Sequence, residues 1–200
     1  MIVGFDFDNT IINYENSFKE LALKKKIISS KINQDKKSIR DYLRKHNKEK
    51  EWTILQGEVY GRYIMKAKVY EGVLDIFQWL TIKKNKIYII SHKTQFPYLG
   101  KKVDLRQSAL NWINKNILIN DKNIKLSKNN FFFKNTIEEK IERIKSLKCD
   151  VFIDDLPEIL ELLPDNLLKI LFSPSIEKKC NKKNYVMRNW NEFPNMIKKR

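Results

Sequence analysis

Two aspartates two residues apart, Asp6 and Asp8, follow a short apolar run at the start of the chain. Successive side chains of an extended chain alternate in direction, so residues i and i+2 point to the same side and both carboxylates can act on one ligand. A buried carboxylate without a partner costs free energy, and a divalent metal is a partner that satisfies two of them at once. The commonest use of such a metal is phosphate chemistry, so the pair predicts a metal-assisted phosphate reaction.

Polar residues also follow two later apolar runs, KIYIIS and VFI. The first run ends in Ser91, and the second is followed by Asp154 and Asp155. Runs rich in β-branched and aromatic residues are typical of buried strands. Strands are predicted at about residues 1–7, 86–91, 131–133, 151–153 and 168–172.

Segments with helical periodicity separate these strands, which predicts an α/β fold: a Rossmann-like parallel sheet with helices on both faces. Ligands of such sheets bind beyond the carboxyl ends of the strands, where the strand order reverses. Asp6, Ser91 and Asp154 all fall at strand ends. We therefore expect them to meet at one edge of the sheet.

Residues 14–68 show apolar residues at helical spacing and no strand pattern. A length of 200 residues suits one domain with a subsidiary insertion. We therefore expect a core of residues 1–13 and 69–200 that is interrupted by a helical segment at 14–68. The aromatic residues of this segment are expected in its interior, with a substrate-facing surface as the alternative: Trp52, Tyr60 and Tyr63.

The formal net charge of +16 raises the question of a nucleic-acid partner. The lysines are scattered over the expected helices and do not form one basic block with interleaved aromatics. Attraction of an anionic, phosphorylated substrate accounts for the same excess of charge. A nucleic-acid partner is therefore the less favoured interpretation.

No apolar run is long enough to cross a bilayer, so no membrane partner is expected. The chain contains two cysteines, Cys149 and Cys180. Cys149 adjoins an apolar run and is expected to be a small core residue. A disulfide is not expected, because the chain is interpreted as cytoplasmic.

Four elements in this order resemble the haloacid dehalogenase (HAD) superfamily of phosphohydrolases. They span residues 1 to about 172, and their order, spacing and placement at strand ends carry the resemblance. The elements are a DxDxT sequence (Asp6, Asp8, Thr10), a serine that closes a strand (Ser91), a lysine at a helix start (Lys140) and an acidic pair (Asp154 and Asp155).

A second signature refines the resemblance. The sequence SHKT at 91–94, together with FIDDLPE at 152–158, resembles a little-characterised bacterial group of these hydrolases. Because His92 and Lys93 adjoin the expected phosphate site, the resemblance makes them candidate substrate contacts. The helical segment 14–68 resembles the small helical caps of the superfamily, which close over the site and exclude water.

The resemblance implies covalent phosphoryl transfer. Asp6 would attack phosphorus to form an aspartyl-phosphate, and Asp8 would protonate the leaving alkoxide and then deprotonate the attacking water. Thr10 and Ser91 would contact the substrate, with Ser91 donating a hydrogen bond to a phosphoryl oxygen. Lys140 would neutralise the charge shared by the nucleophile and the phosphoryl group. An acid at the position of Asp8 favours phosphate ester hydrolysis over carbon–halogen cleavage, because a halide needs no proton.

The metal that the resemblance implies is Mg²⁺. It would be held by Asp6, by the backbone carbonyl of Asp8 and by at least one carboxylate of the acidic pair, with waters completing an octahedron. The sequence leaves open whether Asp154 or Asp155 touches the metal.

Two lysines compete for the role of the active-site lysine. Lys140 lies closer to Asp154 in sequence than is usual for the family, and Lys134 is the competitor. Thr136 and Glu139 form a capping-box sequence, which puts Lys140 in the first turn of its helix, near the carboxyl edge of the sheet. This placement favours Lys140.

These features together predict a Mg²⁺-dependent phosphatase that acts on a small phosphorylated metabolite. Two alternatives stay open: a nucleic-acid end phosphatase, which the charge would suit, and a non-catalytic binding or regulatory protein on the same fold. The presence of every residue type that catalysis needs favours an enzyme. The sequence indicates neither the substrate nor an oligomeric state.

Overall fold

The computed structural model describes residues 1–31, 33, 35–119, 121, 123–175 and 185–198. The chain forms two compact units, which are described one at a time. The first unit consists of Met1–Ile12, Val69–Lys93 and Ile117–Arg200, and the second of Asn13–Lys68 and Thr94–Asn116.

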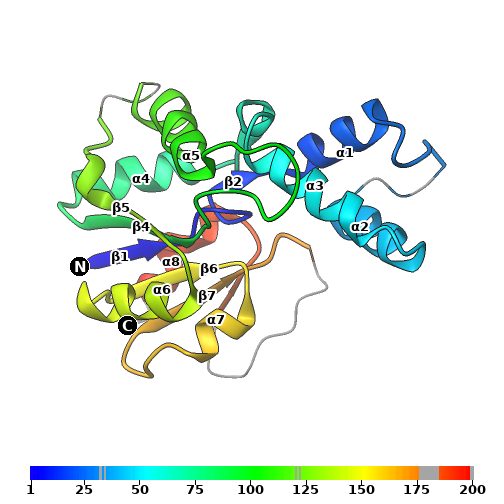
Figure 1. Cartoon of the computed structure of the whole chain (residues 1–200). Coiled ribbons are helices and arrows are strands. Elements are labelled where there is room, and N and C mark those ends of the chain that lie inside the picture. The colour runs from blue at the N-terminus through cyan, green and yellow to red at the C-terminus, as the bar shows by residue number, and fades with distance from the viewer. Residues whose placement is uncertain (32, 34, 120, 122, 176–184, 199–200) are drawn as a thin grey trace. The chain divides into compact units, whose positions relative to one another are not determined.

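A parallel sheet forms the centre of the first unit (Figure 1). In the described residues it has six strands in the order β5-β4-β1-β6-β7-β8, and every neighbouring pair is parallel. This confirms the predicted Rossmann-like α/β fold and all five predicted strands. The additional strand, β8, is too short to show a sequence pattern. The strands are β1 (Ile2–Phe5), β4 (Lys86–His92), β5 (Phe131–Lys134), β6 (Val151–Asp154), β7 (Leu168–Phe172) and β8 (Tyr185–Met187).

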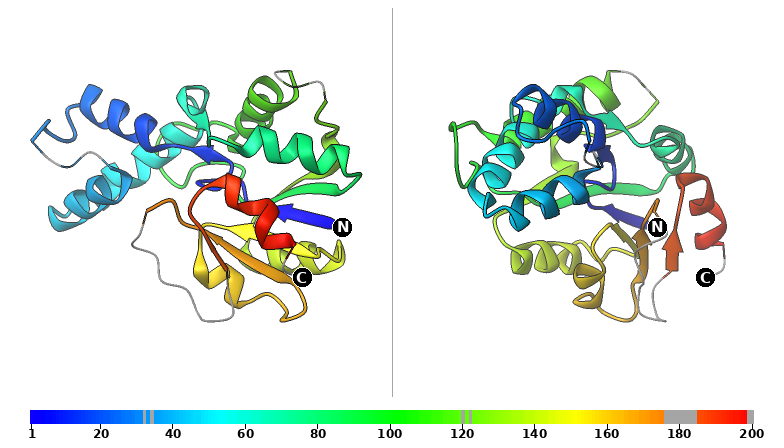
Figure 2. Two further views of the ribbon diagram at one scale, coloured as in Figure 1. Left: turned by 180° about the vertical axis from the view of Figure 1, so that it is seen from behind. Right: turned by 90° about the vertical axis from the view of Figure 1, so that its right-hand side faces the viewer.

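Helices cover both faces of this sheet (Figure 2). Helices α6 and α7 pack on one face, where Ile144 and Phe152 belong to one buried apolar cluster. On the other face lie α4 and α8, and the Phe5 ring is 4.9 Å from that of Phe77 and 6.3 Å from that of Phe193. The helices are α4 (Val73–Ile82), α6 (Ile137–Ser146), α7 (Pro157–Glu161) and α8 (Phe193–Ile197).

Strand β1 is the point at which the strand order reverses. Strand β4 pairs with one side of β1 and β6 pairs with the other, so the two halves of the sheet diverge from it. Because all the strands are parallel, their carboxyl ends lie at one edge of the sheet. The residues that follow β1 and that end β4 and β6 are therefore neighbours, where this class of fold binds its ligands.

The second unit is helical and has an aromatic interior. The Phe18 ring stacks on that of Trp52 at 5.2 Å, and Tyr60 packs edge-on against Phe18 at 5.8 Å. Trp52 and Tyr60 therefore contribute to the interior of this unit. Its helices are α1 (Glu15–Lys24), α2 (Lys36–Lys45), α3 (Glu49–Tyr60) and α5 (Leu105–Ile113). The chain passes between the units four times. Two of these passages lie within the short paired strands β2 (Ile12–Asn13) and β3 (Lys68–Val69), and the others follow Lys93 and Asn116.

The loop before α5 belongs to the helical unit. Pro97 packs on Gly57 of α3 so closely that a Cβ atom at Gly57 would lie 2.7 Å from the Pro97 Cβ atom. The helical unit thus contains residues 94–116 in addition to 13–68. The interpretation of this unit as a cap stays a prediction, as does the predicted domain boundary.

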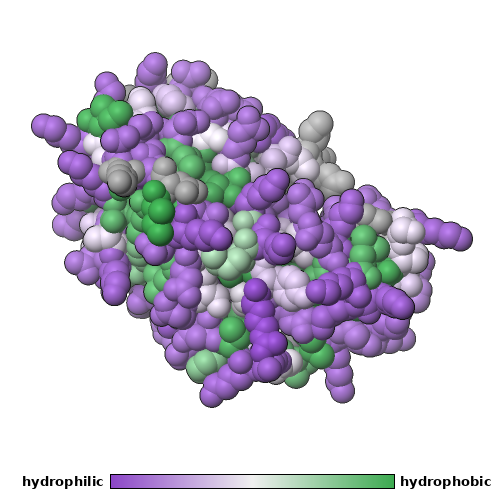
Figure 3. Space-filling view, turned by 90° about the horizontal axis from the view of Figure 1, so that it is seen from above, coloured by the Kyte–Doolittle hydropathy of each residue, from purple (hydrophilic) through white to green (hydrophobic). Residues whose placement is uncertain are grey.

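Within the described part of the chain, no helix combines the length and the apolarity that crossing a bilayer requires. Hydrophilic residues cover most of the face drawn in Figure 3. Cys149 is buried, as expected, and its thiol is free, whereas Cys180 lies outside the described residues.

Candidate functional site

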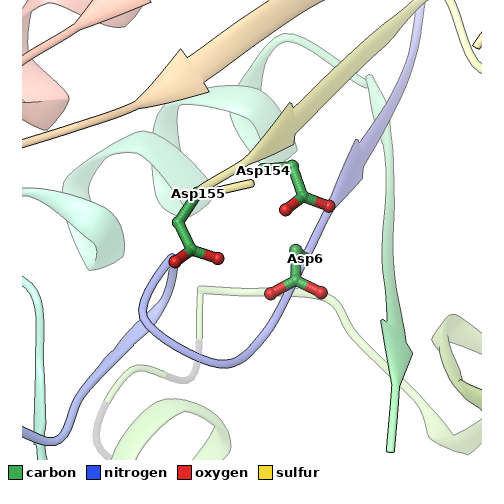
Figure 4. A group of neighbouring side chains, drawn as sticks. All are labelled: Asp6, Asp154 and Asp155. Atoms are coloured by element: carbon green, nitrogen blue, oxygen red, sulfur yellow. The ribbon is translucent and has the colours of Figure 1, made fainter. Parts of the chain in front are cut away.

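Three buried carboxylates converge at the reversal point of the sheet (Figure 4). Asp6 directly follows β1, Asp154 ends β6, and Asp155 is the next residue. Each residue offers one carboxylate oxygen, and these oxygens all lie within 4.8 Å of one another. The structure therefore gathers the carboxylates that the sequence places at two strand ends.

A buried lysine joins two of these carboxylates. Lys140 Nζ lies 2.6 Å from Asp6 Oδ1 and 2.6 Å from Asp154 Oδ2. Thr136 caps α6 by accepting a hydrogen bond from the Glu139 N–H, so Lys140 lies at the start of this helix, beside the carboxyl edge of the sheet. The Glu139 side chain reaches back one residue further than a capping box requires.

Hydrogen bonds orient two of the carboxylates. The Ser91 hydroxyl donates to Asp6 Oδ1 at 2.9 Å, and the Leu156 N–H donates to Asp154 Oδ1 at 2.9 Å. The Asp6 N–H donates to the Ile153 carbonyl at 2.8 Å, which extends the pairing of β1 with β6 by one residue. Ser91 is therefore part of the cluster, and backbone pairing sets the position of Asp6.

Burial and charge together control the ionisation of this cluster. Burial raises the pKa of Asp6 to about 8; Lys140 opposes the rise, whereas Asp154 and Asp155 add to it. Burial by itself would lower the pKa of Lys140, but Asp6 and Asp154 together raise it above its ordinary value. One ammonium group thus contacts two of the three carboxylates, Asp6 and Asp154.

The donor set of this cluster fits a hard divalent cation. Carboxylate oxygens are the protein ligands that suit Mg²⁺, and Asp6, Asp154 and Asp155 could each supply one. Burial first, and then the charges of Asp154 and Asp155, raise the pKa of Asp6, so both oppose its ionised form. A cation at this position would favour the ionised form of Asp6.

The side chain of Asp8 has a different partner. Asp8 lies three residues beyond the end of β1. Its two carboxylate oxygens lie 3.0 Å and 2.8 Å from Lys93 Nζ. The contribution of the Asp8 backbone carbonyl to a metal site stays a prediction.

The remaining candidate residues have other surroundings. Thr10 is fully buried, and its hydroxyl has no hydrogen-bond partner among the residues that the structure describes. His92 Nε2 lies 2.9 Å from the carbonyl oxygen of Asn135, a hydrogen bond that ties β4 to the loop before α6. Lys134 is half-buried at the end of β5. Of the two competing lysines, Lys140 is the one whose ammonium contacts Asp6.

Sequence reasoning missed the pairing of Lys93 with Asp8. It placed both residues near the site but assigned Lys93 to the substrate. The two residues are 85 positions apart and follow neighbouring strands, β4 and β1. The adjacency of these strands is the signal that could have revealed the pair.

Comparisons with known proteins bear on the fold. No family model matches the chain. A protein from Oceanobacillus iheyensis whose provisional name is nucleotidase is 23% identical over 197 residues, which are 96% of this chain and 97% of that protein. A solved structure of a provisionally named phosphatase from Clostridium difficile aligns with a TM-score of 0.62 at 13% identity, over 98% of this chain and 97% of that chain.

A second solved structure contains magnesium. It is a provisionally assigned HAD hydrolase from Bacillus subtilis, which aligns with a TM-score of 0.59 at 13% identity over 98% of each chain. These alignments show that the present chain has the fold of HAD-superfamily hydrolases. The resemblance found in the sequence is thereby confirmed as far as the fold is concerned.

Proposed function

We propose that this protein is a Mg²⁺-dependent phosphohydrolase that cleaves a phosphate monoester of a small metabolite through an aspartyl-phosphate intermediate. The observation that carries the proposal is the position of Lys140, which contacts Asp6 and Asp154 beside Ser91 and Asp155. The proposed nucleophile therefore lies beside a hydroxyl that could donate a hydrogen bond to the phosphoryl group, an ammonium group, and carboxylates that could bind a metal. They lie on the fold of known HAD-superfamily hydrolases.

The proposed reaction has two steps. In the first, Asp6 attacks phosphorus, the bond from phosphorus to the leaving oxygen breaks, and Asp8 gives its proton to that oxygen. In the second, Asp8 takes a proton from a water molecule whose oxygen attacks the phosphoryl group, and phosphate leaves Asp6. Ser91 donates a hydrogen bond to a phosphoryl oxygen, and Lys140 offsets negative charge on Asp6 and on the phosphoryl group.

The proposed metal ligands are Asp6, Asp154, Asp155 and the backbone carbonyl of Asp8. When bound, Mg²⁺ supplies positive charge that favours ionised Asp6 and stabilises negative charge on the phosphoryl oxygens. The Leu156 N–H and Lys140 already hold Asp154, so its carboxylate is oriented in advance.

The proposal also concerns the class of substrate. The name of the Oceanobacillus iheyensis relative supports a nucleoside monophosphate as the first small metabolite to test. Nucleic-acid ends are the second candidate, and the net charge of +16 is the observation that favours them. Turnover of an end-phosphorylated oligonucleotide that falls steeply with salt would support this second candidate, and weak salt dependence would count against it. A cytoplasmic location stays a prediction.

A panel of phosphate monoesters tests the proposal. The panel contains p-nitrophenyl phosphate, nucleoside monophosphates, sugar phosphates and an end-phosphorylated oligonucleotide, each assayed with Mg²⁺ and with EDTA. We expect turnover that requires Mg²⁺ and that Asp6→Asn removes, since the nucleophile is lost. Unchanged hydrolysis by Asp6→Asn would contradict the mechanism, and no turnover of any ester would favour a non-catalytic protein.

A further inference from the structure

A second buried lysine lies beside the proposed site and contacts the proposed acid. Lys93 Nζ lies within 3.0 Å of both oxygens of the Asp8 carboxylate. The Lys93 side chain is 3% exposed and that of Asp8 is 19% exposed. Taking an ammonium group out of water costs several kcal/mol, so such a pair is weak evidence for a role in stability and calls for another explanation.

Contacts fix Lys93 both at its backbone and at its ammonium group. The Lys93 N–H donates to the Lys134 carbonyl at 2.8 Å, which continues the pairing of β4 with β5. Its ammonium lies 5.6 Å from the centre of the Phe7 ring, and Phe7 packs edge-on against Phe133. The Lys93 ammonium is therefore placed by packing as well as by the charge of Asp8.

Lys140 and Lys93 each contact carboxylates of the proposed site. Lys140 contacts Asp6 and Asp154, and Lys93 contacts Asp8. An aspartate side chain has two rotatable bonds, and one ammonium that contacts both of its oxygens restricts them. Proton transfer needs its donor within hydrogen-bond reach of the leaving oxygen, so a fixed carboxylate is an advantage there.

We infer that Lys93 is a positioning residue that holds the Asp8 carboxylate in the orientation needed for proton transfer to the leaving group. This inference rests on the proposed function, in which Asp8 is the acid and base. Lys93 neither gives nor takes a proton. The proton passes from Asp8 to the leaving oxygen as the ester bond breaks, and Asp8 regains one from water as phosphate leaves Asp6.

This role has a consequence that a substrate-binding lysine would lack. An alkoxide is a poor leaving group and needs the proton of Asp8, whereas p-nitrophenolate leaves without one. The ratio kcat/KM reports only the steps up to the first irreversible one, so it reports cleavage of the ester and not the later release of phosphate from Asp6. Loss of Lys93 should therefore lower kcat/KM for alkyl phosphates much more than for p-nitrophenyl phosphate.

The test compares Lys93→Met, which keeps an apolar stem without the charge, with Lys169→Met. Lys169 is a matched control because it is also a buried lysine of the sheet, on β7, and its ammonium lies 3.3 Å from the exposed Asp165. For Lys93→Met we expect kcat/KM to fall about 100-fold on the best alkyl phosphate of the panel, the scale of general acid catalysis. On p-nitrophenyl phosphate we expect kcat/KM of Lys93→Met to fall less than about 10-fold. Lys169→Met should have the kcat/KM of the wild type on both esters.

A second measurement links the effect to Asp8. In an Asp8→Asn background, Lys93→Met should no longer change the ratio of the two kcat/KM values, because the group that Lys93 positions is absent. Equal losses on both esters would identify Lys93 as a phosphate contact and overturn the inference. An unchanged effect of Lys93→Met in the Asp8→Asn background would overturn it as well. A wild-type protein that hydrolyses neither ester overturns the proposed function first, and the inference with it.

Discussion

Lys140 Nζ lies 2.6 Å from a carboxylate oxygen of Asp6 and 2.6 Å from one of Asp154. Asp6 follows β1, where the strand order reverses, and Asp154 ends β6, which pairs with β1. One ammonium therefore links two segments of the chain that lie far apart in sequence. We expect both the stability of this edge of the sheet and the proposed chemistry to depend on this ammonium, because its loss would leave two buried carboxylates without it.

Replacing Lys140 should lower both the stability of the protein and its activity. Lys140→Met leaves buried carboxylates without their ammonium, and breaking a buried pair in this way costs about 3–5 kcal/mol. We expect that loss in the free energy of unfolding, measured with urea in EDTA. Hydrolysis of p-nitrophenyl phosphate should fall about 100- to 1,000-fold, as when one electrostatic contact to the transition state is removed.

Lys134→Met is the matched control for this variant. Lys134 is the lysine that the sequence left as the alternative, and its side chain is half-buried. We expect its removal to leave turnover within about twofold of the wild type, because the ammonium that contacts Asp6 is that of Lys140 and little transition-state stabilisation is lost. A larger loss of turnover for Lys134→Met than for Lys140→Met would reverse the assignment.

The two residues of the acidic pair, Asp154 and Asp155, should have different roles in stability and in Mg²⁺ binding. Both oxygens of Asp154 already accept hydrogen bonds, from the Leu156 N–H and from Lys140, so Asp154→Asn should destabilise the metal-free protein. Asp155→Asn should chiefly reduce the stabilisation that Mg²⁺ provides. At a Mg²⁺ concentration of about 100 times Kd this stabilisation is about 2.7 kcal/mol. Thermal melts of both variants with Mg²⁺ and with EDTA measure the two effects, and a full Mg²⁺-induced shift in Asp155→Asn would contradict this division.

Without metal, the stability of the protein should depend on pH through Asp6. Burial raises the pKa of Asp6 from 3.8 to about 8, so the native state keeps a proton that the unfolded chain releases. The contribution of this bound proton to the free energy of unfolding is complete below about pH 4 and is lost as the pH rises through 8. In EDTA, the free energy of unfolding of the wild type relative to Asp6→Asn should therefore fall between about pH 5 and pH 8. A difference that stays constant over this range would show that the Asp6 carboxylate is not perturbed by burial.

Much of this site could be predicted from the sequence because parallel strands present their ends at one edge. Asp6, Ser91 and Asp154 each adjoin the end of an apolar run, and the fold brings those ends together. Lys140 was predictable for a local reason, since the cap at Thr136 sets the start of its helix. In each case a short-range pattern determines the position.

What escaped prediction depends on packing between segments that are distant in sequence. Lys93 pairs with Asp8 only because β4 lies next to β1 and because both residues follow the strand ends. The loop before α5 joins the helical unit because Pro97 packs on Gly57, a contact that no periodicity reveals. The last strand of the sheet, Tyr185–Met187, is three residues long and has no pattern to detect.

Gly4, in the strand that leads to Asp6, offers a test of how tightly this edge is packed. A Cβ atom there would lie 2.6 Å from Cδ2 of Phe152, its partner in register on β6, and 3.2 Å from Sγ of Cys149. Gly to Ala changes can stabilise by about 0.4–1 kcal/mol through the unfolded chain, whereas overpacking a core costs about 1–3 kcal/mol. We expect the clash to dominate, so Gly4→Ala should destabilise the protein in urea unfolding.

A second substitution shows whether the Phe152 ring is the cause. Phe152→Leu alone removes buried contacts from the apolar cluster and should destabilise the protein. In the Gly4→Ala background it also makes room for the new methyl group, so the double variant should lose less stability than the sum of the two single changes. Strict additivity would mean that the strain at Gly4 is relieved elsewhere, because the ring then plays no part in it.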